Sequence, residues 1–374
     1  MLLRTGRLRR TLAATALTLT AVLGVGSWAA ADSQAAVTGP PPGSAAWVAD
    51  TALGVRLPDP ASAAPAEVAA FFAALPPAQR RALAVRHPQV VGNLDGAPVE
   101  LRYLANGLAL AESRADQERR AADPALPERD RAAARALAAR YASLAGRQIL
   151  LFDPRGRGQV AEVYGDLATA RRTAVIVPGS DIDLHSFDRA TDPYGTPAGM
   201  ARSLREATGG QVAVVAWAGY TTPVGLGLDA ATADLARAGA VRLERLLAGL
   251  APVTGPVTVF CHSYGSVVCG HADLRPEQVA DAVVLASPGT GLARAGQLRV
   301  PLWAVRRNAE DWIGEVPHVS VLGLGHGADP TDPGFGARPI PSTGSHGHGG
   351  YFAPGTASLA AFAELAGREV SRGA

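Results

Sequence analysis

In the second half of the chain, short runs of apolar residues alternate with longer stretches that have helical spacing. From residue 147 onward, eight such runs predict β-strands, at residues 148–152, 159–164, 173–177, 211–216, 257–261, 282–286, 302–306 and 319–322. Helices are predicted at residues 196–207, 228–250, 266–274 and 356–370. This alternation predicts an α/β fold, in which an eight-stranded and mostly parallel sheet is covered by helices on both faces. The first two strands, joined by a short glycine-containing turn at 153–158, are expected to be antiparallel.

The first half of the chain has a different composition. Alanine, leucine, arginine and glutamate dominate residues 65–145. Helical spacing predicts helices at 66–75, 77–87 and 99–145, the last broken near Asp123-Pro124 and Pro127. A helical N-terminal region is therefore expected over residues 63–146, packed on an α/β domain that spans residues 147–374. Residues 32–62 are rich in Ala, Pro, Gly and Ser, which predicts a flexible linker.

Residues 1–31 have the three parts of an export signal. Arginines between residues 4 and 10 are followed by an uncharged, mostly apolar stretch at 11–28, and then by Ala29-Ala30-Ala31, which offers an A-x-A cleavage site. We expect cleavage after residue 31, secretion from a bacterial cell and no stable membrane anchor after processing. An uncleaved anchor is the alternative, which the short, threonine-rich span disfavours. The pair Arg9-Arg10 leaves both the general and the twin-arginine export route open.

The charge balance argues against some classes of partner. The chain has 35 basic residues, all of them arginine, and 33 acidic residues. Removal of residues 1–31 leaves 31 basic and 33 acidic residues, a formal charge of −2. Such a balance gives no reason to expect a nucleic-acid partner or attraction to an anionic membrane. The sequence leaves the oligomeric state open.

Residues 257–266 combine a strand, a serine and a helix in a pattern typical of one fold. The predicted strand runs directly into Cys261-His262-Ser263-Tyr264-Gly265, and a helix follows. A sharp strand-to-helix turn of this kind is the nucleophile elbow of α/β-hydrolases, which holds a serine hydroxyl clear of the backbone. The turn needs small residues two positions before and after the serine, where Cys261 and Gly265 stand. Ser263 is therefore the candidate nucleophile, and the eight strands predict an α/β-hydrolase sheet.

A nucleophilic serine needs an imidazole as general base and a carboxylate that orients the imidazole, and in this fold the chain order is Ser, acid, His. Asp311, in a loop after the seventh strand, is the candidate acid, with Glu310 as its rival. His348 is the candidate base because a Gly-His turn leads into the final helix, and His326 and His346 are the alternatives. No third ligand accompanies His346 and His348 at metal-binding spacing, so no metal is expected.

Acyl transfer also requires two backbone N–H groups directed at the developing oxyanion. The amide of Tyr264, directly after the nucleophile, is one candidate. The other is the amide of Ser180 or Asp181, in the loop after the third strand, where Gly179 permits a close approach of the backbone.

Several aromatic residues fall at predicted strand ends or in loops and are candidates for lining an apolar pocket: Trp217, Tyr220, Tyr264, Trp312 and Tyr351. Each could equally pack against the sheet. Residues 63–146 and the long loop at 323–347 could cover the site. Cys261 and Cys269 flank the nucleophile; export permits a disulfide between them, and two buried thiols are the alternative.

Several motifs together resemble an actinobacterial family of secreted α/β-hydrolases whose members are largely uncharacterised. They are H-S-Y-G-S at the elbow, P-G-S after the third strand, N-A-E-D-W-I around Asp311 and G-H-G-G-Y-F around His348. Two further segments are similar to signatures of that family. One is G-N-L-D-G at 92–96, followed by Arg102 and Asn106, and the other is D-P-T-D-P-G-F-G-A at 329–337. The resemblance implies Ser263 as nucleophile, Asp311 as orienting acid and His348 as base. It implies a hydrolase without naming a substrate.

The sequence therefore predicts a secreted serine hydrolase that acts on a small-molecule acyl substrate and uses no cofactor. A carboxylic ester is the expected substrate class. A peptidase or amidase would use the same groups. A secreted binding protein that kept the hydrolase scaffold without catalysis is the alternative from a different class.

Overall fold

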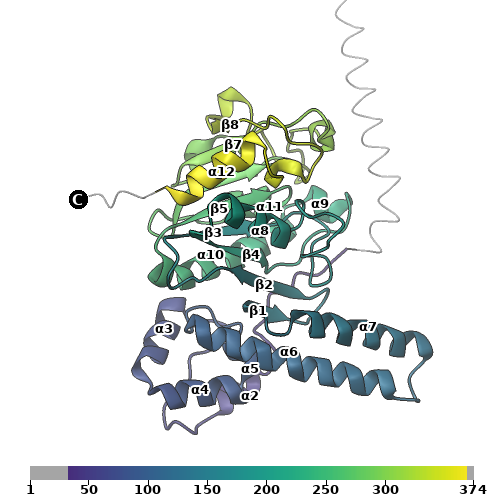
Figure 1. Cartoon of the computed structure of the whole chain (residues 1–374), viewed down its shortest axis with the longest axis vertical. Coiled ribbons are helices and arrows are strands. Elements are labelled where there is room, and N and C mark those ends of the chain that lie inside the picture. Colours follow the sequence, from purple (N-terminus) through teal and green to yellow (C-terminus); the bar gives the residue numbers. More distant parts are fainter. Residues whose placement is uncertain (1–32, 369–374) are drawn as a thin grey trace, which may run out of the picture.

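The computed structural model describes residues 33–368 (Figure 1). The predicted signal peptide at residues 1–31 lies outside the described residues. Eight strands form one sheet in the order β1-β2-β4-β3-β5-β6-β7-β8. They are β1 (Ile149–Asp153), β2 (Gln159–Tyr164), β3 (Arg172–Val177), β4 (Val212–Ala218), β5 (Val257–His262), β6 (Val279–Leu285), β7 (Leu302–Val305) and β8 (Arg338–Ile340). β2 is antiparallel to both β1 and β4, and the remaining pairs are parallel. The predicted α/β fold with an antiparallel start is confirmed.

Helices cover both faces of the sheet, as expected for parallel strands that are apolar on both sides. Successive side chains of a strand point to opposite faces, so that Val259 packs with α10 and α11 whereas Phe260 packs with α8 and α12. The helices of this domain are α8 (Pro197–Ala207), α9 (Leu228–Ala231), α10 (Asp234–Thr254), α11 (Gly265–His271) and α12 (Ala357–Gly367), with short 3₁₀ turns η1 (Ala295–Gln297), η2 (Trp312–Glu315), η3 (Pro333–Phe335) and η4 (Gly350–Phe352).

The position predicted for the eighth strand is wrong. Residues 319–322 lie in an exposed loop, and the eighth strand is the three-residue segment Arg338–Ile340, which pairs with β7. A segment of four residues, three of them apolar, cannot be assigned to a strand or a loop from its own pattern. The true strand contains Pro339, which a sheet edge tolerates because one side of the strand needs no hydrogen-bonding partner.

The N-terminal region is helical, as predicted, with α2 (Ser44–Ala49), α3 (Pro65–Ala74), α4 (Pro77–Arg86), α5 (Pro88–Val91), α6 (Val99–Ala122) and α7 (Glu128–Leu144). The break between α6 and α7 falls at the predicted prolines, which cannot continue a helix. α6 and α7 form a long antiparallel hairpin that extends away from the sheet (Figure 1). The remaining helices enclose a small core of their own around Trp47 and Phe72. Trp47 belongs to the stretch expected as a linker; its ring is fully buried and its N–H donates to the Pro58 carbonyl at 2.7 Å.

Asparagine side chains of the N-terminal signature attach the helical region to β1. Asn106 donates to the carbonyls of Gly92 and Ile149, at 3.0 and 2.9 Å. Asn93 donates to the Phe152 carbonyl at 2.8 Å and accepts from the Phe152 amide. A side-chain amide that bonds both polar groups of a strand residue replaces part of the missing edge pairing of β1. The signature residues therefore have a structural role at this junction.

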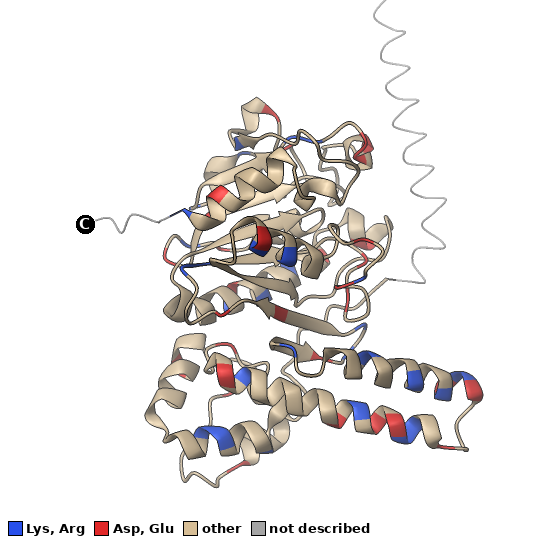
Figure 2. Ribbon diagram, viewed as in Figure 1, with Lys and Arg blue, Asp and Glu red and all other residues tan. Residues whose placement is uncertain are grey.

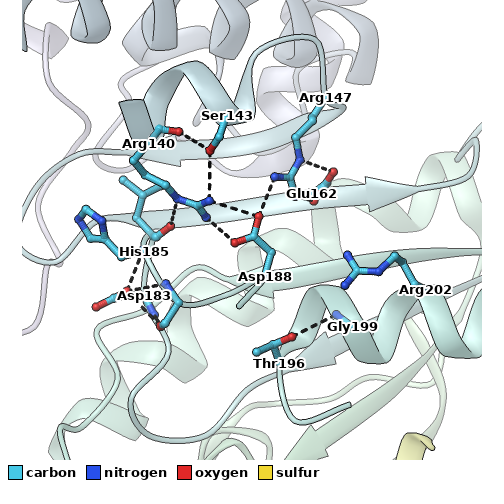
Figure 3. Close-up of polar contacts among 12 residues, drawn as sticks. Arg140, Ser143, Arg147, Glu162, Asp183, His185, Asp188, Thr196, Gly199 and Arg202 are labelled. Carbon is cyan, nitrogen blue, oxygen red and sulfur yellow. Dashed lines mark hydrogen bonds and ion pairs between the residues drawn. The ribbon is translucent and has the colours of Figure 1, made fainter. Parts of the chain in front are cut away.

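Ion pairs connect the hairpin to the loop that follows β3 (Figure 3). Asp188 of this loop lies 2.7 Å from Arg140 of α7 and 2.7 Å from Arg147, which precedes β1. Arg147 also donates to Glu162 of β2 at 2.7 Å. Burial raises the pKa of Asp188, but the hydrogen bonds from both arginines outweigh it, so the pKa lies below its ordinary value. The same loop begins with Gly179 and Ser180, so the helical region fixes a segment that reaches the candidate site.

Charged residues are unevenly distributed. Arginine and acidic residues alternate along the outer ends of α6 and α7, whereas the ribbon of the sheet is largely free of them (Figure 2). Exposed pairs such as Arg114–Glu118 explain how this part of the hairpin remains solvated. Among residues 33–368, no helix has both the length and the apolar composition that a membrane crossing requires.

Candidate active site

Ser263 stands in the sharp turn between β5 and α11. Its φ of 54° lies in the left-handed region, which a non-glycine residue adopts only when its surroundings enforce it. The Ser263 amide donates to the Leu285 carbonyl at 3.0 Å, which fixes the turn against β6. A Cβ atom on Gly265 would lie 2.4 Å from the Val177 carbonyl oxygen, so only glycine fits there. The turn therefore has the geometry of a nucleophile elbow.

The structure brings Ser263, Asp311 and His348 together. His348 Nε2 lies 2.9 Å from Ser263 Oγ, and His348 Nδ1 lies 2.8 Å from Asp311 Oδ1. Asp311 also accepts from the Tyr351 hydroxyl at 2.6 Å and from the Ile313 amide at 3.1 Å. Burial raises the pKa of the Asp311 carboxyl, but the hydrogen bonds from His348 and Tyr351 outweigh it and the pKa lies below its ordinary value. The carboxylate is therefore ionised at neutral pH and orients the imidazole.

The alternative acid and bases lie elsewhere. Glu310 and His346 are both exposed and contact each other, 3.0 Å apart, on the outer side of the loop. His326 is buried, and its Nε2 donates to the Ala230 carbonyl at 2.7 Å. Of the three histidines considered, only His348 reaches Ser263.

Two polar side chains that sequence reasoning did not assign hold the His348 turn in place. His262 Nε2 donates to the His348 carbonyl at 2.9 Å, and Asn308 Nδ2 donates to the Gly347 carbonyl at 2.8 Å. Burial, followed by the charge of the neighbouring His348, lowers the pKa of His262 to about 3, so His262 is neutral. Asn308 is the first residue of the N-A-E-D-W-I motif, and this position is the one feature of the sequence that indicates a role for Asn308 at the site.

Gly179 leaves open the space beside the serine hydroxyl. A Cβ atom at this position would lie 2.9 Å from Ser263 Oγ and 3.1 Å from the Tyr264 amide nitrogen. An oxyanion held by the Tyr264 amide would occupy this region. Within residues 33–368, the amides of Tyr264 and Ser180 donate no hydrogen bond to the protein. The Asp181 amide, by contrast, donates to the Pro223 carbonyl at 2.8 Å. Asp181 is therefore wrong as a candidate second donor, because its N–H group is already bonded.

Most of the aromatic pocket candidates belong to the core. The side chains of Trp217, Tyr220 and Tyr351 are buried, with the Tyr220 hydroxyl bonded to the Pro178 carbonyl and Trp217 stacked on Tyr220. Of the two alternatives left open for these three residues, packing within the core is the one that their burial favours. Tyr264 is also buried and donates to the Thr232 carbonyl. Trp312 is partly exposed, and its ring lies over that of His348 with 4.5 Å between centroids.

Cys261 and Cys269, the two cysteines of the chain, form a disulfide with a Cα–Cα distance of 6.4 Å. The bond links the end of β5 to α11 and so crosses the elbow that carries Ser263. Over the described part of the chain, no cluster of three or more His, Cys, Asp or Glu side chains could hold a metal ion.

Comparison with known proteins agrees with this fold. Residues 153–321 match the family model described as alpha/beta hydrolase. The chain is 27% identical over 382 residues to an uncharacterized protein of Mycobacterium tuberculosis, covering 83% of this chain and 57% of the relative. A second uncharacterized protein of M. tuberculosis is 35% identical over 178 residues, which are 44% of this chain and 66% of the relative. The chain thus spans little more than half the length of the longer mycobacterial relatives.

Among solved structures, the apo form of Thermogutta terrifontis esterase 2 is similar at 16% identity, with a TM-score of 0.31 over 56% of this chain and 87% of that one. The family model covers the segment from the end of β1 to the loop before β8, including the Ser263 elbow and Asp311. The match to the family model and the eight-stranded sheet described above together show that the chain has the α/β-hydrolase fold.

Proposed function

We propose that the protein is a secreted serine hydrolase that cleaves carboxylic esters through an acyl-enzyme. The observation that carries this proposal is the pair of contacts from one imidazole, 2.9 Å to Ser263 Oγ and 2.8 Å to Asp311 Oδ1. With Nδ1–H donating to the carboxylate, Nε2 of His348 is left as the acceptor for the hydroxyl proton. The motifs that resemble a secreted actinobacterial family support the same proposal.

In the proposed reaction, Ser263 Oγ attacks the acyl carbon while His348 Nε2 takes the hydroxyl proton. The amides of Tyr264 and Ser180 stabilise the negative charge that develops on the carbonyl oxygen. His348 returns the proton to the ester oxygen, the alcohol leaves, and the acyl group remains on Ser263. A water molecule, deprotonated by the same imidazole, then attacks the acyl carbon; the bond to Ser263 Oγ breaks, the carboxylic acid leaves, and His348 returns the proton to Ser263 Oγ. Asp311 keeps Nδ1 protonated throughout and stabilises the imidazolium, so the cycle requires no cofactor.

Replacement of the nucleophile tests the proposal. Ser263→Ala should abolish hydrolysis of a p-nitrophenyl ester and labelling by a fluorophosphonate probe, while far-ultraviolet circular dichroism is unchanged. Ser143→Ala is the matched control, because the Ser143 hydroxyl bonds only within the exposed hairpin region. Full esterase activity in the Ser263 variant would reject the assignment. Failure of the wild-type protein to react with the probe would favour the non-catalytic binding protein, and preferential cleavage of amides would favour the peptidase.

Export is the second part of the proposal. The disulfide between Cys261 and Cys269 supports it, because disulfides persist mainly in oxidising compartments. N-terminal sequencing of protein recovered from a bacterial culture medium should give a first residue of Asp32. Retention of the protein in the cytoplasm with residues 1–31 still attached would contradict the predicted signal peptide.

A further inference from the structure

Six apolar side chains are exposed on loops around the candidate site, and we call them the apolar rim. The exposed fractions are 99% for Leu322, 72% for Leu226, 60% for Val321, 52% for Val319, 50% for Val224 and 39% for Trp312. Val224 and Leu226 follow β4, whereas Trp312 and the segment from Val319 to Leu322 follow β7, about 90 residues later in the sequence. Single exposed apolar residues are ordinary, whereas a group of them beside one site calls for an explanation.

The segment with Val224 and Leu226 lies beside the proposed oxyanion site. The Asp181 amide donates to the Pro223 carbonyl at 2.8 Å, and the Gly225 amide donates to Asp181 Oδ1 at 2.8 Å. Asp181 follows Ser180 directly. This part of the apolar rim is therefore fixed to the loop that approaches the serine from one side.

The segment with Val319, Val321 and Leu322 is a small hairpin on another side of the site. Val321 and Leu324 exchange two backbone hydrogen bonds, of 2.9 and 3.0 Å, and the Gly325 amide donates to the Ala231 carbonyl at 2.8 Å. The next residue, His326, packs its ring edge-on against Tyr264, with 5.5 Å between centroids. Tyr264 adjoins the nucleophile. Trp312, which lies over His348, adds a third side to the apolar rim.

Two of the three segments of the apolar rim, those that carry Val224 and Val319, have no formal charge, whereas Trp312 stands between Asp311 and Glu315. Residues 219–228 and 316–328 contain no Arg, Lys, Asp or Glu. The histidines in the second segment are His318 and His326, and burial lowers the pKa of each below its ordinary value, so both are neutral at pH 7. An uncharged surface can enter an apolar phase without the cost of desolvating an ion.

We propose that the apolar rim docks the protein on a lipid surface, so that the substrate of Ser263 is an acyl ester presented in a lipid layer or droplet. The substrate part of this inference rests on the proposed esterase function. A side chain such as Leu322, with 99% of its surface exposed, points into solvent and cannot wall a cleft for one acyl chain. A second copy of the chain seated on the rim would cover Ser263, whereas a lipid layer brings the ester to it.

Vesicle binding tests the docking step without catalysis. In a Ser263→Ala background, the protein should co-sediment with phosphatidylcholine vesicles, whose zwitterionic headgroups exclude attraction by net charge. The triple substitution Val319→Ser, Val321→Ser and Leu322→Ser should weaken binding at least tenfold, because burial of each apolar side chain contributes a transfer free energy. The control triple, Val48→Ser, Val85→Ser and Val241→Ser, removes valines that are 58, 51 and 57% exposed on α2, α4 and α10, and should bind like the parent.

The outcomes separate the two proposals. Equal binding by both triple variants, or no binding by the parent, would overturn the lipid-docking inference, even if a soluble ester is still hydrolysed in a Ser263-dependent way. Rim-dependent binding by a protein that hydrolyses no ester would leave docking intact and overturn the esterase. If the rim triple instead dissociates a dimer in lipid-free sedimentation velocity and the parent does not bind vesicles, the surface is an interface between copies of the chain. When Ser263 is retained, the rim triple variant should hydrolyse an emulsified long-chain ester more slowly than the wild-type protein. Its hydrolysis of soluble p-nitrophenyl acetate should equal that of the wild type.

Discussion

Replacement of Gly179 by alanine offers a sharp test of the proposed oxyanion site. The added Cβ atom would lie 2.5 Å from Ser263 Cβ, 2.9 Å from Ser263 Oγ and 3.1 Å from the Tyr264 nitrogen. Gly179 is not among the glycines with positive φ, so its backbone accepts an L-residue. Steric conflict at the nucleophile is therefore the main expected effect of the substitution.

The magnitude follows from the distances. Non-bonded carbon atoms prefer a separation of about 3.5–4.0 Å, so the backbone at Gly179 or the Ser263 side chain must move by roughly 1 Å. A displacement of that size between reacting groups costs about 10²-fold in rate, and loss of one oxyanion donor costs about 10²–10³-fold. Both act on the same step and are not additive, so we expect kcat/KM to fall by about 10²–10³-fold. Overpacking should also lower the free energy of unfolding by about 1–3 kcal/mol.

The assay measures kcat/KM for a p-nitrophenyl ester, the rate of fluorophosphonate labelling, and urea unfolding for each variant. Gly107→Ala on the exposed surface of α6 is the control, since nothing lies within 4 Å of the added Cβ atom. That variant should keep wild-type activity and gain about 0.5–1 kcal/mol in stability, because alanine restricts the unfolded chain and favours the helix. A folded Gly179→Ala protein with wild-type kcat/KM would refute the assignment of the oxyanion site.

Three further predictions follow from contacts around the site and the hairpin. Tyr351→Phe removes the hydrogen bond to Asp311 Oδ2, and kcat/KM should fall roughly tenfold, because a hydrogen bond to a charged group contributes about 1.5–3 kcal/mol. The free energy of unfolding should decrease as the pH falls from about 6.5 towards 3, by up to about 1.4 kcal/mol per pH unit from His262, since its pKa is lowered to about 3 and the unfolded chain binds the proton first. Asp188→Ala should lower the free energy of unfolding by roughly 2 kcal/mol, between the values for exposed and buried ion pairs, because Arg140 and Arg147 lose their shared partner.

Each of these has a matched control. The Tyr351 variant should lose about 1.5–3 kcal/mol in the free energy of unfolding and still be folded in the assay, and a loss of activity that tracks the unfolded fraction would contradict a positioning role. His262→Gln retains a donor for the His348 carbonyl and should flatten the pH dependence of unfolding below pH 6.5; an unchanged slope would mean that other groups cause it. Glu118→Ala removes one partner of an exposed pair and should change stability by less than about 1 kcal/mol. An equal effect at Asp188 and Glu118 would show that burial of the Asp188 network adds nothing.

The sequence by itself determined the elements and their class. Seven of the eight strands and the break between α6 and α7 follow from local periodicity and from proline, because hydrophobic spacing and backbone restriction act within a few residues. The turn around Ser263 was also visible locally, since a strand, a serine and Gly265 must be consecutive to form it. The eighth strand was not visible, because Arg338–Ile340 is ordered by its pairing with β7 and not by its own composition.

The tertiary structure decided which side chains meet. His326, His346 and His348 follow glycine or precede it in similar loops, and only the fold places His348 against Ser263. It equally decided that Tyr351 bonds Asp311 from within the core, that the Asp181 amide is occupied by Pro223, and that Val321 and Leu322 face solvent. Such facts depend on neighbours supplied by segments tens of residues away. Burial and hydrogen bonding are properties of the packed chain, whereas periodicity is a property of a segment, and the division between what was predicted and what was found follows that difference.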